Sequence, residues 1–259
     1  MSPPVPDIVV LAGGLGTRLR DVVEPGLPKL LVPIHGRPFL DYLLSWLRRQ
    51  GATRVTFALG YGADRIIPAL QQRTGCLPFA IDWTVETAPR GTAGAIALAL
   101  HDRPSGPGLV INGDTLVDIH LPDFCAAFPH QAELGLVAVK VPDAARFGLL
   151  SLDAQNRVAR FLEKPHARPA GGGWINGGIY LLSEPVMARL RGMAEGSFER
   201  DVMMRLPPGT IWAWPQRCRF LDIGTASSLS EAFEVLAPLA EGFRDGALWR
   251  GSATVTPAP

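Results

Sequence analysis

Short apolar segments that alternate with helical segments in residues 1–114 constrain the fold of this chain more than any other feature. Strands are predicted at 8–11, 54–60, 79–86 and 108–114, and helices at 38–49, 63–73 and 91–102. Strands that alternate with helices predict a parallel sheet with helices on both faces. Ligands of such sheets bind beyond the carboxyl ends of the strands. We therefore expect an α/β fold whose site lies at those strand ends.

The second half of the chain has a different pattern, with more strands and fewer helices. Strands are predicted at 132–141, 147–153, 157–163, 174–182, 210–215 and 219–225. Short helices are expected near Glu184 and Glu199, and a longer one over 226–240. This pattern predicts a smaller β extension, mixed or antiparallel, laid against the first sheet. Residues 241–259 have little core-forming pattern and are expected to form a tail after a single domain of residues 1–240.

Charge and composition exclude several classes of protein. The chain of 259 residues has 25 Lys and Arg against 24 Asp and Glu, so broad attraction to nucleic acid or to anionic membrane is not expected. No apolar stretch approaches the ~20 residues of a membrane span, and the N-terminus does not resemble a signal peptide. The three cysteines are far apart and predict buried, reduced thiols in a cytoplasmic protein, and the histidines lack zinc-site spacing.

A glycine-rich segment follows the first predicted strand and precedes two cationic residues. Gly13, Gly14 and Gly16 would let backbone N–H groups approach a polyphosphate, although such glycines also serve tight packing. The segment is not a Walker loop, because no Gly-Lys-Ser/Thr follows. It is not a dinucleotide fingerprint either, because the third glycine is missing and Arg18 follows the glycines instead. Arg18 can bind phosphate oxygens bidentately and Lys29 adds a second positive charge, so the pattern predicts a phosphate-chain site.

Two aspartates, Asp114 and Asp222, each follow an apolar run that ends in a short polar turn. A lone Asp in this position is commonly a turn or N-cap residue. If both carboxylates converge at the sheet end, they form the hard-oxygen site that Mg²⁺ prefers. We therefore expect Mg²⁺ as a cofactor.

Six motifs, in order along the chain, resemble those of the nucleoside-triphosphate-dependent sugar-1-phosphate nucleotidyltransferases. The resemblance extends from about residue 8 to residue 236. It implies a Rossmann-like, three-layer α/β/α fold of the GT-A-like type, with a mostly parallel central mixed sheet and a smaller sugar-binding β extension. The motifs are "LAGGLGTRL…LPK" from Leu11, "GTAGAI" from Gly91, "NGD" from Asn112, "EKP" from Glu163, "NGGIY" from Asn176 and "DIGT" from Asp222.

The resemblance also implies roles for individual residues, with residues 1–130 mainly binding nucleotide and residues 131–240 mainly binding sugar phosphate. The implied catalytic residues are Arg18, Lys29, Asp114 and Lys164, and the implied metal ligands are Asp114 and Asp222. The implied nucleotide-binding residues are Leu11, Ala12, Gly13, Gly14, Gly16, Thr17, Arg18, Glu86, Gly91, Thr92 and Gly113. The implied sugar-phosphate-binding residues are Gly148, Glu163, Lys164, Asn176 and Gly177.

The implied reaction is in-line attack by a sugar 1-phosphate on the α-phosphorus of a nucleoside triphosphate, with release of pyrophosphate. No covalent nucleophile is needed, because the attacking phosphate oxygen is already anionic and has only to be aligned and screened. Arg18 and Lys29 would hold the departing phosphates, and Lys164 would hold the incoming sugar phosphate.

Several stretches resemble one branch of the family, which transfers a guanylyl group from GTP to D-glycero-α-D-manno-heptose 1-phosphate. These stretches are "GRPFLDYLL", "VPDAARFG" and "GSFERDV". Mannose-1-phosphate guanylyltransferases and glucose-1-phosphate thymidylyltransferases share the six motifs, so both activities stay open as alternatives. A homo-oligomer also stays open. A non-catalytic regulatory subunit is the alternative of another class. It is disfavoured because Arg18, Lys29, Asp114 and Asp222 are all present.

Overall fold

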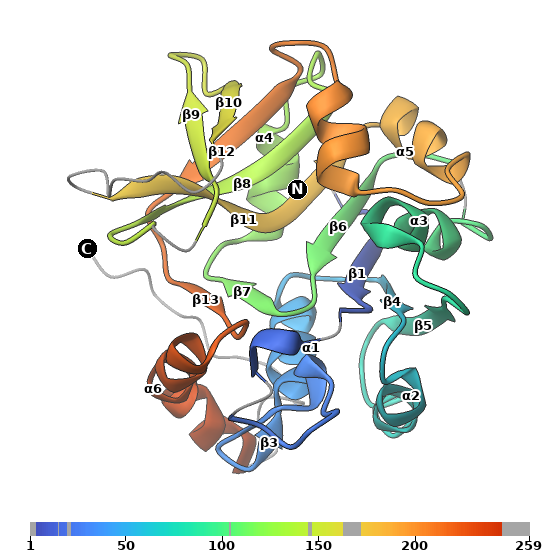
Figure 1. Cartoon of the computed structure of the whole chain (residues 1–259), viewed down its shortest axis with the longest axis vertical. Helices are drawn as coiled ribbons and strands as arrows, with labels where there is room; N and C mark the ends of the chain where they lie inside the picture. Colours follow the sequence, from blue (N-terminus) through green and yellow to red (C-terminus); the bar gives the residue numbers. More distant parts are fainter. Residues whose placement is uncertain are drawn as a thin grey trace.

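The computed structural model describes residues 4–14, 16–19, 22–103, 105–144, 147–162 and 172–244 (Figure 1). Its helices are Phe39–Arg49 (α1), Ala63–Gln71 (α2), Gly91–Ala99 (α3), Leu121–Ala127 (α4), Glu184–Arg191 (α5) and Ala226–Arg244 (α6). Its strands are Ile8–Ala12 (β1), Pro33–Ile34 (β2), Arg37–Pro38 (β3), Arg54–Leu59 (β4), Ala80–Val85 (β5), Gly108–Asn112 (β6), Thr115–Val117 (β7), Leu134–Val141 (β8), Leu149–Leu152 (β9), Val158–Leu162 (β10), Gly173–Leu182 (β11), Ile211–Gln216 (β12) and Phe220–Asp222 (β13).

Nine strands form one mixed sheet, in the order β10-β9-β11-β6-β1-β4-β5, with β8 paired to both β11 and β12. The neighbours β6, β1, β4 and β5 are parallel, as the alternation of strands and helices predicts. The second half does not lie against this sheet, as was expected, but continues it. Strand β11 pairs antiparallel with β6, so that Ile179 lies opposite Ile111. The open side of β6 offers free backbone groups, and β11 satisfies them.

Helices cover both faces of the sheet and divide its core into two. One core packs α1, α2 and α6 against β1 and β4, with Leu43, Ile66 and Leu236 among its buried side chains. The other packs α3 and α5 on the opposite face, with Ile96 and Leu190 among its buried side chains. Successive strand residues point to opposite faces, so both layers bury apolar side chains of the same strands. The predicted three-layer α/β/α architecture is confirmed.

The last helix extends further than the sequence pattern indicates. Helix α6 continues past residue 240 to Arg244, into the segment expected to form a tail. Leu229, Ala232 and Leu236 are buried along one side of the helix and dock it against the first core. Across the described ranges, no helix is both long enough and apolar enough to span a bilayer.

The three cysteines were expected to be buried, but Cys76 is exposed, and Cys125 and Cys218 are only partly buried. Burial raises the pKa of Cys125 to about 11. Burial also raises the pKa of Cys218 to about 11, and the negative charge of Asp118 adds to the effect. At pH 8 only about a thousandth of a thiol with such a pKa is thiolate, and the thiolate is the reactive form.

We therefore expect the folded protein to show one fast-reacting thiol per chain with a chromogenic disulfide reagent at pH 8. The Cys76→Ser variant should lose this fast phase, and the remaining thiols should react only after unfolding. Two or more fast thiols in the folded wild-type chain would contradict this assignment.

Candidate active site

A two-stranded ribbon at the carboxyl end of β6 brings the two predicted metal ligands together. Strands β7 and β13 pair antiparallel, with Asp222 directly opposite Thr115, the residue that follows Asp114. The backbone N–H of Ile223 donates to the carbonyl oxygen of Asp114 at 3.0 Å, which extends the ribbon by one bond. The two aspartates are therefore neighbours in space although 108 positions separate them in the sequence.

Lys29 contacts the first of these aspartates. Its Nζ atom donates to Oδ2 of Asp114 at 2.7 Å, and the two side chains are 24% and 31% exposed. The backbone of Lys29 lies in a short 3₁₀ turn, Lys29–Leu31, which the buried side chain of Leu30 anchors. A Cβ atom on Gly16 would lie 3.6 Å from Cγ of Lys29, so the glycine-rich segment lies beside the lysine side chain.

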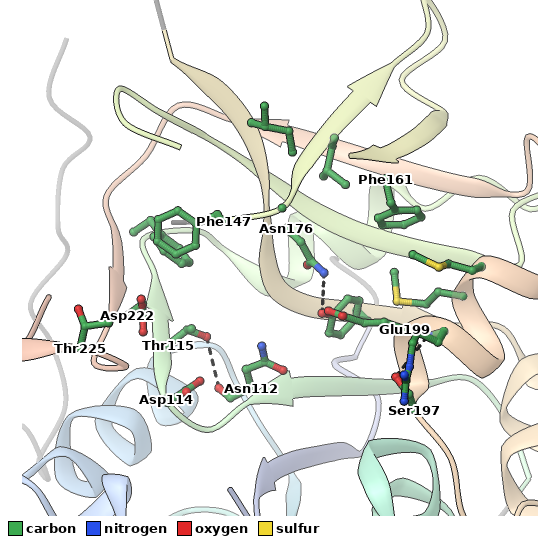
Figure 2. Close-up of a pocket in the computed structure, with 18 of the residues that line it drawn as sticks. Asn112, Asp114, Thr115, Phe147, Phe161, Asn176, Ser197, Glu199, Asp222 and Thr225 are labelled. Atoms are coloured by element: carbon green, nitrogen blue, oxygen red, sulfur yellow. Dashed lines mark hydrogen bonds between the residues drawn. The ribbon is translucent and has the colours of Figure 1, made fainter. Parts of the chain in front are cut away.

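A cavity of about 950 Å³ opens beside the aspartates. It contains five of the predicted site residues: Arg18, Asp114, Gly148, Asn176 and Asp222. Figure 2 shows Asp114 and Asp222 toward one end of this cavity, Ser197 and Glu199 toward the other, and Asn176 between them. The cavity therefore joins residues of the two halves of the chain.

Asn176 is fixed by an irregularity in β11. Its Nδ2 donates to the hydroxyl of Tyr180 at 2.7 Å, and its Oδ1 accepts from the backbone N–H of Gly178 at 3.0 Å. The pairing of β11 with β8 shifts register between Asn176 and Tyr180, and such irregularities re-aim side chains near functional sites. Burial raises the pKa of Tyr180, and the charge of Glu199 adds to the effect, so this phenol stays protonated.

The predicted nucleotide residues at the ends of β1, β4 and β5 lie side by side but outside the lining of this cavity. A Cβ atom on Gly13 would lie 3.3 Å from the backbone nitrogen of Gly60, and one on Gly60 would lie 2.6 Å from Oε1 of Glu86. Oε2 of Glu86 accepts from the backbone N–H of Arg90 at 3.0 Å. Gly13, Gly60 and Glu86 therefore lie together, and we call these three residues the glycine shelf. Leu11 and Ala12 at the end of β1, with Gly14 and Gly16 after it, also lie outside the cavity lining.

Three further predicted nucleotide residues contact other segments of the chain. Gly113 packs against β1, and its N–H donates to the carbonyl of Leu11 at 2.9 Å. The hydroxyl of Thr92 accepts from the backbone N–H of Phe198 at 2.7 Å. Gly91 has a φ of +70°, and a Cβ atom there would lie 2.4 Å from the carbonyl oxygen of Gly196. The start of α3 is thus bound to the segment that carries Ser197 and Glu199.

Four predicted site residues remain: Gly177, Thr17, Glu163 and Lys164. Gly177 does not line the cavity, and a Cβ atom there would lie 3.0 Å from the carbonyl oxygen of Val137, which favours glycine. Thr17 begins a short 3₁₀ turn that also contains Arg18. Glu163 and Lys164 lie outside the described residues.

The cavity also contains residues that the sequence reasoning did not assign to the site. Glu199 lies in a turn of π-helix, Phe198–Val202, an element that is frequent at functional sites. The stretch "GSFERDV" contains it, but nothing in those letters predicts a π-helical turn that faces a cavity. The other unassigned residues of the lining are Asn112, Thr115, Phe147, Leu149, Leu150, Phe161, Tyr180, Ser197, Arg200, Met203, Met204, Phe220 and Thr225.

The donor set fits a metal that is shared with a substrate. Among the residues that the structure describes, no three His, Cys, Asp or Glu side chains are grouped so that they could hold an ion. Mg²⁺ is commonly held by one or two carboxylates, with water and substrate phosphates completing its coordination. The neighbouring carboxylates of Asp114 and Asp222 suit that arrangement.

Comparison with known proteins defines the class. The profile of the nucleotidyl transferase family matches residues 7–237. The chain therefore belongs to the nucleotidyl transferase family, and the prediction from its motifs is confirmed.

Individual similar proteins show which members of the family the chain resembles. D-glycero-alpha-D-manno-heptose 1-phosphate guanylyltransferase from Campylobacter jejuni is 32% identical over 191 residues, which are 74% of this chain and 82% of that protein. Mannose-1-phosphate guanyltransferase beta-B from Xenopus laevis is 30% identical over 221 residues, 83% of this chain and 60% of that protein. The crystal structure of HddC from Yersinia pseudotuberculosis complexed with GMP-PN has a TM-score of 0.79 and 34% identity, covering 90% of this chain and 100% of that one. The GT-A-like fold prediction is confirmed.

Proposed function

We propose that the protein transfers a guanylyl group from GTP to D-glycero-α-D-manno-heptose 1-phosphate in a Mg²⁺-dependent reaction. The observation that carries the proposal is the convergence of Asp114, Asp222 and Asn176 at one cavity at the carboxyl ends of the sheet, with Lys29 paired to Asp114. The names of two similar proteins, a heptose 1-phosphate guanylyltransferase and a mannose-1-phosphate guanyltransferase, favour guanine as the base. The fold similarity to a protein crystallised with GMP-PN favours it further.

In this reaction an oxygen of the sugar phosphate attacks the α-phosphorus of GTP. The new P–O bond forms as the bond to the β-phosphate oxygen breaks, and pyrophosphate carries the electron pair away. Arg18 and Lys29 hold the β- and γ-phosphates and stabilise the charge that develops on the leaving group. Lys164 holds the incoming sugar phosphate and reduces the repulsion between the two anions.

Each substrate has its own part of the site in this proposal. The base lies on the glycine shelf, near Gly60 and Glu86, and Gly91 and Thr92 support it from the start of α3. The sugar lies in the cavity, where Gly148 and Asn176 face its hydroxyl groups. The family motif assigns Glu163 to the same hydroxyl groups. Asp114 and Asp222 hold Mg²⁺, which supplies positive charge to the triphosphate when it is bound.

GTP is expected to exceed ATP, UTP, CTP and dTTP by at least about tenfold in kcat/KM with the heptose 1-phosphate. Guanine offers N1–H and N2–H donors that a carboxylate or carbonyl can accept, and a site built for them leaves groups unpaired when adenine binds. Each unpaired group costs about 1–3 kcal/mol. Pyrophosphate release over a panel of five triphosphates measures the preference.

The same panel, run with heptose, mannose and glucose 1-phosphates, tests the sugar. The heptose 1-phosphate should give the highest kcat/KM. A preference for dTTP or UTP would contradict the choice of base, and a preference for mannose 1-phosphate would contradict the choice of sugar. Glu86→Gln, which keeps the shape of the side chain and removes its charge, should reduce the ratio of GTP to ATP use.

A further inference from the structure

The ion pair between Lys29 and Asp114 joins two groups to which the proposed function gives different partners. Lys29 would bind the phosphate chain, and Asp114 would bind the metal ion. Lys29 Nζ lies 2.7 Å from Asp114 Oδ2. The lysine therefore engages one of the two oxygen atoms that Asp114 can offer to a metal ion.

We infer that Lys29 holds the place of the divalent cation in the free protein. The cation then binds well only when a triphosphate draws the ammonium group away from Asp114. This inference rests on the proposed function, because it takes Asp114 as a metal ligand and Lys29 as a phosphate ligand. It adds that metal and nucleotide bind together, and that Lys29 couples the two events.

The backbone near Lys29 is held so that only its side chain is free to move. The 3₁₀ turn Lys29–Leu31 is closed by a bond from the N–H of Leu31 to the carbonyl of Pro28 at 2.9 Å. Leu30 is 3% exposed in the first core, and Pro28 packs against Gly62, where a Cβ atom would lie 2.4 Å from Pro28 Cγ. The side chain of Lys29, in contrast, is 24% exposed beside the glycine-rich segment. A rotation of this side chain can transfer the ammonium group from carboxylate to phosphate.

The charges explain why the exchange needs a triphosphate. An ammonium group on Asp114 neutralises one of two neighbouring carboxylates and repels a divalent cation at the same place. Within the described part of the chain, Asp114 forms an ion pair with Lys29 alone. A triphosphate offers Lys29 several anionic oxygens and adds its own oxygens as metal ligands, so both partners of the ion pair are satisfied separately.

Binding of Mn²⁺ to the free protein, measured by the electron paramagnetic resonance signal of unbound Mn²⁺, tests this inference without turnover. Without nucleotide, Lys29→Met should bind Mn²⁺ about five- to tenfold more tightly than the wild type, because the competing charge is removed. Lys29→Gln should show the same direction. The double variant with Asp114→Asn should lose the gain, because the freed ligand is absent.

Arg65→Met is the matched control, because Arg65 also pairs with a carboxylate, that of Glu24 at 3.3 Å, on the exposed surface. It removes one positive charge from the chain and should leave Mn²⁺ affinity unchanged. Equal Mn²⁺ affinity in the wild type and in both folded Lys29 variants would overturn the inference while leaving the proposed function standing. If the wild type binds no Mn²⁺ even with a non-hydrolysable GTP analogue, the metal assignment falls and the inference falls with it. Thermal unfolding confirms that each variant is folded.

Discussion

Asp114→Asn and Asp222→Asn are each expected to lower kcat/KM for nucleotidyl transfer by about 100-fold or more. Loss of a group that stabilises transition-state charge typically costs a factor of this size. The β7–β13 ribbon brings the two aspartates to one cavity, so removal of either carboxylate leaves a single acidic ligand for the cation. Asparagine keeps the shape of the side chain, and the ribbon should stay folded.

Pyrophosphate release with GTP, heptose 1-phosphate and Mg²⁺ measures the loss. Asp118→Asn is the control, because Asp118 follows β7 in the same ribbon but faces solvent, 54% exposed, with Arg219 at 3.6 Å. Its activity should stay within about twofold of the wild type, since exposed ion pairs contribute little. Near-normal activity of either Asp114→Asn or Asp222→Asn would remove that residue from the metal site.

Gly91→Ala should destabilise the protein by about 3 kcal/mol. A left-handed residue with a side chain costs ~1–2 kcal/mol, and the collision with Gly196 adds to that cost. The added Cβ would lie 2.4 Å from the carbonyl oxygen of Gly196, which also accepts from the N–H of Ala93 at 2.9 Å. The variant must therefore move either the start of α3 or the segment that carries Ser197 and Glu199, so activity should fall as well.

Urea denaturation of the Gly51→Ala variant separates the free-energy cost of the left-handed backbone from that of the collision with Gly196. Gly51 has a φ of +74°, close to that of Gly91, but a Cβ atom there would have no neighbour within 4 Å. Its substitution should cost only the backbone part, about 1–2 kcal/mol. If both variants lose the same free energy of unfolding, the contact between α3 and residue 196 contributes nothing.

The sequence pattern predicted the first half of the fold well, and the reason is local. Strands such as β1 and β4 are short, apolar and β-branched, and helices such as α1 show a clear spacing of apolar residues. Pairing between strands far apart in the chain has no such signature. Nothing in residues 108–112 or 173–182 shows that β6 and β11 are antiparallel neighbours, so the extension was expected in a separate layer.

The sequence likewise predicted some features of the site and not others. The motifs predicted Asp114, Asn176 and Asp222, and the structure gathers all three at one cavity. Their contacts with each other could not be predicted, because the Lys29–Asp114 ion pair spans 85 residues and depends on tertiary packing. Glu199 was missed because its position depends on a π-helical turn and on the bond between Thr92 and Phe198. The roles of the individual residues, including Glu163 and Lys164, stay predictions.

Strand β6 bonds to β1 on one side and to β11 on the other, so the β6–β11 pairing, together with the β7–β13 ribbon, links the two halves of the chain. A chimera that exchanges residues 131–240 between relatives would have to rebuild the β6–β11 pairing at every position from Gly108 to Ile111. Because this pairing leaves no hinge between the halves, they should unfold in one cooperative transition. Evolution of a new sugar preference in this scaffold is thus confined to side chains and loops around the cavity, because the strand framework that carries both halves cannot be exchanged in parts.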